Sequence, residues 1–186
     1  MYNIDKIKND LQKELSNKRF NHSIMVASEA KKLAENYKEN SEKAYISGLL
    51  HDIAKEYKEE ENLNYVNKYN LSLELLESKY QKIIHSEIGA LVVKEKYNFD
   101  DDICNAIKYH TIGNVNMNML AKIIFIADKI GRENLSSEYK QIQELAYKNI
   151  DEALKLYFLL NNKKLENKGI KPHPNSIELL NFLESE

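Results

Sequence analysis

The 186-residue chain has 42% hydrophobic and 30% charged residues, a composition typical of a folded, water-soluble protein. Its formal net charge of −2 excludes a strongly cationic nucleic-acid-binding protein and gives no reason to expect a basic membrane-binding surface. The one cysteine, Cys104, excludes an intramolecular disulfide and a multi-cysteine zinc site. Because there is also no apolar run of about 20 residues and no secretory signal, the sequence predicts a cytoplasmic protein.

Helical periodicity dominates the chain, and five glycines and two prolines are too few for a many-stranded β fold. Ser41 is the expected N-cap of a buried helix, and a charged helical pair is expected to break near Asn70. Asn175 or Ser176 is expected to cap a short final helix. In chain order, apolar spacing predicts helices over about 19–38, 41–52, 58–79, 84–97, 101–110 and 117–130, two more after 136, and a last one after a loop over 168–174.

This order of elements predicts an all-α protein, a helical bundle formed by one domain over 1–186. Its core is expected to span about 18–132, with the helices and loop of 136–186 packed on it. The mostly apolar segment 117–130 is expected to be a central helix that is buried on most sides.

Polar residues interrupt these apolar helices in a way that requires a physical reason. Asp52 directly follows His51, and Asp128 ends the apolar run over 123–127. A single buried histidine is readily explained as a hydrogen-bonded core residue, and Asp128 as the ion-pair partner of Lys129. An unpaired carboxylate, however, is costly to bury. Four histidines also fall in Ala- and Ile-rich helical surroundings: His22, His51, His85 and His110.

Taken together, the four histidines and two aspartates predict a metal site. Imidazole nitrogen and carboxylate oxygen suit divalent iron, manganese, cobalt or zinc, and open coordination positions suit hydrolysis. Neighbouring residues on a helix project about 100° apart, so His51 and Asp52 can flank an ion and Asp52 can bridge two. The other ligands come from different helices, which places the expected site at the centre of the bundle.

Four further residues are candidates for contacts to phosphate. Lys55 shares a helix face with the predicted ligands, although a solvated lysine is an equal alternative. Arg132 follows Asp128 by one turn, and arginine binds phosphate through paired hydrogen bonds. Thr111 begins a loop that either offers its hydroxyl to phosphate or simply ends a helix. His173 lies between two prolines in a stiff loop that either closes over a nucleotide or forms a plain turn.

The order of these residues resembles the HD superfamily of metal-dependent phosphohydrolases: one His, then His-Asp, then two separate His, then a distant Asp. Within that superfamily the chain is similar to the YqeK-like branch of symmetrical diadenosine tetraphosphate hydrolases, from about residue 18 to 180. The segments that carry the resemblance are Asn21–Ser23, Gly48–Lys55, His85–Ala90, Ile107–Gly113, Ala127–Ile130 and Lys171–Ser176.

The resemblance implies specific roles for these residues. The principal metal, iron in that family, would be held by His22, His51, Asp52 and Asp128. His85 and His110 would complete a second metal site or contact phosphates. The implied catalytic residues are Asp52, His51 and Lys55. The implied nucleotide or phosphate contacts are His22, Asp52, His85, His110, Thr111, Asp128, Arg132 and His173.

The implied reaction is the attack of a metal-bound hydroxide on an inner phosphate. This attack would convert diadenosine tetraphosphate into two ADP. The resemblance implies a small nucleotide as substrate, without nucleic-acid or membrane partners, and it allows a homodimer.

Three alternatives stay open at the level of sequence. One is another HD phosphohydrolase, such as a 5′-nucleotidase or a cyclic-dinucleotide phosphodiesterase, although the chain lacks a Gly-Tyr-Pro triplet. The others are a nucleotide-binding regulatory module with little turnover and a diiron oxygenase built on the same scaffold.

Overall fold

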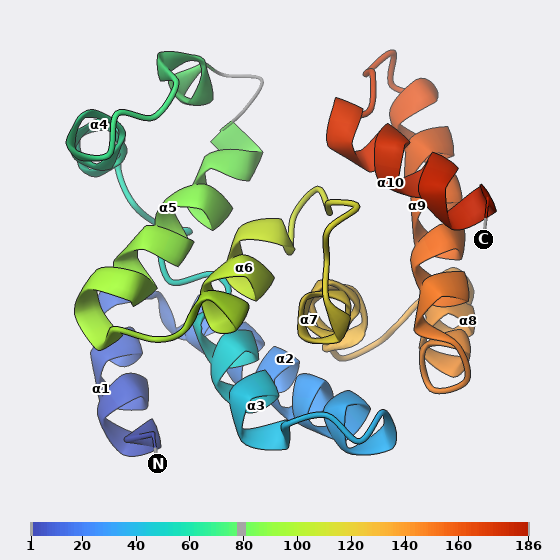
Figure 1. Cartoon of the computed structure of the whole chain (residues 1–186), viewed down its shortest axis with the longest axis horizontal. Helices are drawn as coiled ribbons and strands as arrows, with labels where there is room; N and C mark the ends of the chain where they lie inside the picture. The colour runs from blue at the N-terminus through green and yellow to red at the C-terminus, as the bar shows by residue number, and fades with distance from the viewer. Residues whose placement is uncertain (1, 78–80, 186) are drawn as a thin grey trace.

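The computed structural model of the chain describes residues 2–77 and 81–185, which fold into α-helices, one short 3₁₀ helix and no strand (Figure 1). The predicted all-α fold is confirmed. The helices are α1 (Ile4–Glu14), α2 (Asn17–Asn36), α3 (Ser41–Leu50), α4 (Glu59–Lys68), the 3₁₀ helix (Leu73–Leu76), α5 (Gln81–Tyr97), α6 (Asp101–Tyr109), α7 (Met119–Ile130), α8 (Ser137–Ala146), α9 (Ile150–Glu166) and α10 (Pro174–Ser185).

Side-chain caps set the starts of several helices, and two predicted starts were wrong. The N-cap of α3 is Asn40 rather than Ser41, because the Asn40 side chain accepts a hydrogen bond from the Lys43 amide at 3.0 Å. The final helix begins at Pro174, whose missing N–H is no loss in the first turn. Ser176 does not cap it, since the Ser176 hydroxyl donates to the Ile112 carbonyl at 2.7 Å.

The segment predicted as a helical pair over 58–79 is only partly helical. The expected break at Asn70 is present, because Asn70 has a left-handed backbone with a φ of 50°. After the break the chain forms only the four-residue 3₁₀ helix, and residues 78–80 lie outside the described part of the chain.

The close approach of α3 to α2 depends on Gly48. A Cβ atom at this position would lie 2.8 Å from the backbone Cα of Ala27, which is closer than side chains tolerate. Glycine therefore lets the two helices pack almost backbone to backbone. This contact brings the end of α3, where His51 lies, beside the middle of α2.

The helix α7 is central to the bundle, as predicted. It packs against α2, α3 and α6 on one side and α8 and α9 on the other, and α10 packs against α9 (Figure 1). Most of its side chains are buried, including Phe125 and Lys129. Among the described residues, no helix is both long and apolar enough to cross a membrane.

Candidate metal centre and phosphate pocket

Five helices bring the predicted site residues to one place. His22 lies in α2, His85 in α5 and Asp128 in α7, as expected. His51 and His110 are not inside helices but are the C-cap residues of α3 and α6. Asp52 follows α3 in a turn, so the expected geometry of two neighbours on one helix surface was wrong. His51, Asp52 and His110 therefore reach the centre from the ends of α3 and α6 rather than from a helix face.

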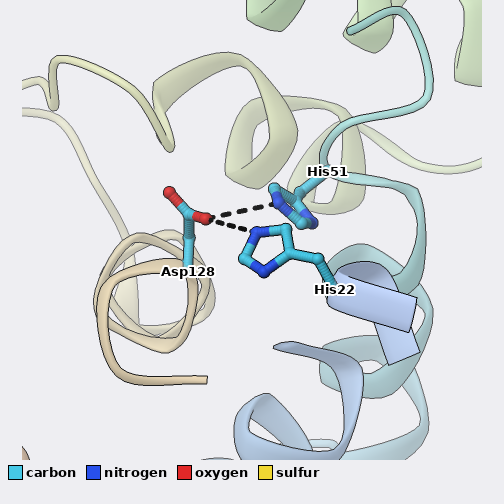
Figure 2. A group of neighbouring side chains, drawn as sticks. All are labelled: His22, His51 and Asp128. Atoms are coloured by element: carbon cyan, nitrogen blue, oxygen red, sulfur yellow. Dashed lines mark hydrogen bonds and ion pairs between the residues drawn. The ribbon is translucent and has the colours of Figure 1, made fainter. Parts of the chain in front are cut away.

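The first group of possible ligands is His22, His51 and Asp128 (Figure 2). The Asp128 Oδ1 atom lies 3.0 Å from the Nε2 atom of His22 and 3.4 Å from the Nε2 atom of His51. One ligand atom from each residue lies within 4.8 Å of the other two. A single ion could therefore contact all three side chains.

The second group is His51, Asp52 and His110, and it shares His51 with the first. The Asp52 Oδ2 atom lies 3.4 Å from His51 Nε2, and its Oδ1 atom lies 3.6 Å from His110 Nε2. His85 joins this group, because its Nε2 atom lies 3.1 Å from Asp52 Oδ1 and 3.1 Å from His110 Nε2. All six predicted ligand candidates thus meet in one cluster.

Backbone contacts fix the ring orientation of two of these histidines and leave Nε2 as the nitrogen available to a metal. His51 Nδ1 donates to the Gly48 carbonyl at 2.7 Å, and His110 Nδ1 donates to the Ile107 carbonyl at 2.6 Å. Because a carbonyl can only accept, each Nδ1 carries a hydrogen, and Nε2 is the ring nitrogen that faces the cluster. His51 Nε2 is a buried atom without a hydrogen-bond partner in the described chain. Such an atom beside two carboxylates fits a cation site.

The electrostatics of the cluster also indicate a cation site. Burial disfavours a charged His51, but Asp52 and Asp128 outweigh burial and raise the pKa of His51 to about 10. Burial would raise the pKa of the Asp52 carboxyl, yet the surrounding His51, His110 and His85 hold that pKa well below its usual range. For His85, burial dominates and lowers the pKa to about 3. The carboxylates that attract a proton to His51 would equally stabilise a metal cation.

Two basic residues next to the cluster were missed by the sequence analysis as functional residues. Arg19 donates to Asp52 Oδ2 at 2.7 Å, and Lys129 donates to Asp128 Oδ2 at 2.7 Å. The signal for Arg19 was present in the sequence, since it is one of two arginines and lies three residues before His22 on the same helix face. The ion pair of Lys129 with Asp128 is an alternative to a metal site in the sequence, but in the structure the ion pair and the metal-type cluster occur together.

The cluster opens into a pocket of about 460 Å³ with a basic wall. Lys55 Nζ lies 3.0 Å from His85 Nε2 and 3.8 Å from Asp52 Oδ1. Thr111 Oγ1 lies 3.3 Å from His110 Nε2. Among the described residues, two carboxylates line this pocket, those of Asp52 and Asp128, against five cationic side chains: Lys18, Arg19, Lys55, Lys129 and Arg132. A basic pocket in a chain of net charge −2 suits a polyphosphate.

Two predicted site residues, His51 and His173, are not among those lining the pocket; His51 is buried within the cluster, whereas His173 lies at the start of α10. The His173 Nδ1 atom accepts a hydrogen bond from the Asn175 amide at 3.2 Å. The same helix start is joined to the turn after His110 through Ser176 and Ile112. The start of α10, which follows the loop of His173, is therefore hydrogen-bonded to the turn after His110.

A helical bundle that gathers His, His-Asp, His, His and Asp around one cation-type cluster has the architecture of the HD domain. Residues 19–133 match the family described as HD domain, and the chain belongs to this family. This confirms the family part of the resemblance found in the sequence.

Within the HD family, individual proteins that are similar to this chain have more specific names. The chain is 36% identical over 146 residues to a protein of Staphylococcus aureus named Bis(5′-nucleosyl)-tetraphosphatase, symmetrical, covering 78% of this chain and 75% of the relative. It is 30% identical over 145 residues to the protein of the same name from Bacillus subtilis, covering 77% of each. A crystal structure from Clostridium acetobutylicum, described as a predicted HD superfamily hydrolase involved in NAD metabolism, superposes with a TM-score of 0.91 at 34% identity, covering 100% of this chain and 98% of that one.

Proposed function

We propose that this chain is a metal-dependent hydrolase that cleaves diadenosine tetraphosphate symmetrically into two ADP. The observation that carries the proposal is the buried His51 Nε2 atom, which has no hydrogen-bond partner in the described chain and lies 3.4 Å from an oxygen of Asp52 and of Asp128, two carboxylates that line a basic pocket. This arrangement combines a place for a divalent cation with a wall that attracts phosphates. The relatives named as symmetrical tetraphosphatases supply the identity of the substrate.

We assign the metal ligands as follows. His22, His51, Asp52 and Asp128 would hold the principal ion, with His85 and His110 available for a second ion or for phosphate. The donor set suits iron, manganese, cobalt or zinc, and we choose iron because the family resemblance implies it. When bound, the metal would lower the pKa of a water molecule and offset negative charge on the phosphoryl oxygens.

The residues of the chain itself would position the substrate. Arg19 and Lys55 flank Asp52 and face the pocket, so they can hold phosphate oxygens close to the ligand cluster. Arg132 keeps its guanidinium at the pocket wall by donating to the Asp128 carbonyl at 2.7 Å. Thr111 offers its hydroxyl to a phosphate beside His110. These contacts would align the central anhydride with the cluster and neutralise the departing ADP.

The proposal is tested with the purified protein, diadenosine tetraphosphate, a mononucleotide and a cyclic dinucleotide assayed side by side. We expect turnover of the tetraphosphate, its loss in excess chelator and its recovery on adding a divalent transition metal. Brisk dephosphorylation of the mononucleotide without turnover of the tetraphosphate would overturn the proposal in favour of a nucleotidase. Oxygen uptake by the anaerobically reconstituted protein, without phosphate chemistry, would instead favour an oxygenase.

A further inference from the structure

A second surface groove begins where the phosphate pocket ends. It has a volume of about 560 Å³ and follows the turn after α7 onto α8. Its lining residues are Arg132, Asn134, Leu135, Lys140, Gln143 and Glu144. Arg132 lines both spaces, so the groove continues outward from the phosphate pocket.

Symmetrical cleavage requires binding surfaces for both nucleotide halves of the substrate, and the phosphate pocket alone provides one. The bond to be broken lies at the middle of the substrate, so an ADP half must extend from the ligand cluster in each of two directions. The pocket of about 460 Å³ surrounds the cluster and suits one nucleotide half with the central phosphates. The second half needs a further surface that starts at the pocket wall.

We infer that the groove along α8 binds the second nucleoside diphosphate half of the dinucleotide, with Lys140 as its main electrostatic contact. This inference rests on the proposed function and extends it by locating the second half of the substrate. Arg132 stands at the junction, where it would contact the phosphates that pass from the pocket into the groove.

The chemistry of the groove matches a nucleoside diphosphate. In the described part of the chain, neither Arg132 nor Lys140 is paired with a carboxylate; the Arg132 guanidinium instead rests 5.7 Å from the Tyr139 ring centre. Both cations are thus available to phosphate oxygens. Gln143 and Glu144 offer hydrogen-bonding groups for ribose hydroxyls or a base, and Leu135 offers an apolar contact.

The deciding experiment measures binding rather than turnover, in the metal-loaded protein. The probes are ADP and a diadenosine tetraphosphate analogue whose central bridging oxygen is replaced by methylene. We expect the wild-type protein to bind the analogue more tightly than ADP. Lys140→Glu should weaken binding of the analogue about tenfold, the effect of losing one charge-assisted contact, and change ADP binding less than twofold.

Lys148→Glu is the matched control, because Lys148 is also an exposed lysine that follows α8 but does not line the groove. It should leave both affinities unchanged. The inference is overturned if the wild-type protein binds the analogue no better than ADP, if Lys140→Glu weakens both ligands equally, or if the two variants behave alike. A protein that binds the analogue through Lys140 but does not hydrolyse diadenosine tetraphosphate would refute the proposed function and leave the groove assignment standing.

Discussion

Lys129 bridges the Asp128 carboxylate and the backbone carbonyl of His110, the C-cap residue of α6. Its Nζ atom lies 2.7 Å from Asp128 Oδ2 and 3.2 Å from the His110 carbonyl, in a buried position over the face of the Phe125 ring. Burial disfavours the ammonium charge, but Asp128 outweighs it and raises the pKa of Lys129. Lys129 therefore holds one oxygen of Asp128 and leaves the other facing His22 and His51.

Replacing Lys129 with methionine should weaken both the fold and metal binding. The change leaves a buried carboxylate oxygen and a buried carbonyl without their donor, and breaking a buried ion pair in this way costs about 3–5 kcal/mol. Urea unfolding and titration of the metal-free protein with Fe²⁺ or Mn²⁺ measure the two effects. Lys108→Met is the control, because Lys108 pairs with Glu87 at the surface, where a pair contributes about 0–1 kcal/mol. Equal stability of the two variants would contradict this role of Lys129.

Asp52→Ala should remove most bound metal and activity. Asp52 contacts His51, His85 and His110, so its loss takes away the carboxylate that the second ligand group shares. Metal content by elemental analysis, together with a hydrolysis assay, tests this. Asp101→Ala, which removes an exposed carboxylate paired with Lys94, should change neither. Full activity of the Asp52 variant would refute the metal-dependent mechanism.

Arg132→Ala should leave the metal content intact and reduce kcat/KM about 10- to 150-fold. A charge-assisted hydrogen bond to phosphate contributes about 1.5–3 kcal/mol, which corresponds to that range. Arg132→Lys should recover only part of the loss, because an ammonium cannot make the paired contacts of a guanidinium. If metal content falls in parallel with activity, Arg132 acts through Asp128, whose carbonyl it contacts, rather than on the substrate.

Gly48→Ala tests whether helix packing sets the spacing of the ligands. The added Cβ would lie 2.8 Å from the Ala27 Cα atom, and relieving such overpacking typically costs about 1–3 kcal/mol. We expect lower stability and weaker metal binding, because α3 carries His51 and α2 carries His22. At Gly89, by contrast, a Cβ would meet side-chain atoms at 3.4 and 3.5 Å, so Gly89→Ala should have a smaller effect on both measurements. The reverse order would show that ligand spacing does not depend on this contact.

Much of the fold and the set of side chains that cluster at its centre could be predicted from the sequence because both leave local patterns. Apolar periodicity marks the helices, and polar residues such as Asp128 stand out in an apolar helix. Predicting how the residues meet was harder. His51 and His110 act from helix ends, where single-residue shifts in a helix boundary decide the direction of a side chain. The contact between Arg19 and Asp52 joins residues 33 apart, and periodicity carries no such information.

For His173 the sequence predicts the local structure but not where that structure lies in the fold. Its position between two prolines indicates a stiff loop, and the start of α10 does follow it directly. Where that loop lies depends on contacts made elsewhere, such as the Leu179 side chain against Gly113, whose φ of 75° suits glycine. These long-range contacts hold α10 against the turn that follows His110. The choice between a lid and a supporting turn could not be made from the motif alone.

The most direct test of the central claim is the identity of the products from diadenosine tetraphosphate in ¹⁸O-labelled water, with the metal-loaded protein. Attack of water at an inner phosphorus gives ADP as the sole nucleotide product, with heavy oxygen in half of the ADP molecules, because the other half arises as the leaving group. We predict that result, together with its loss in Asp52→Ala. The appearance of AMP and ATP would contradict a symmetrical cut at this cluster.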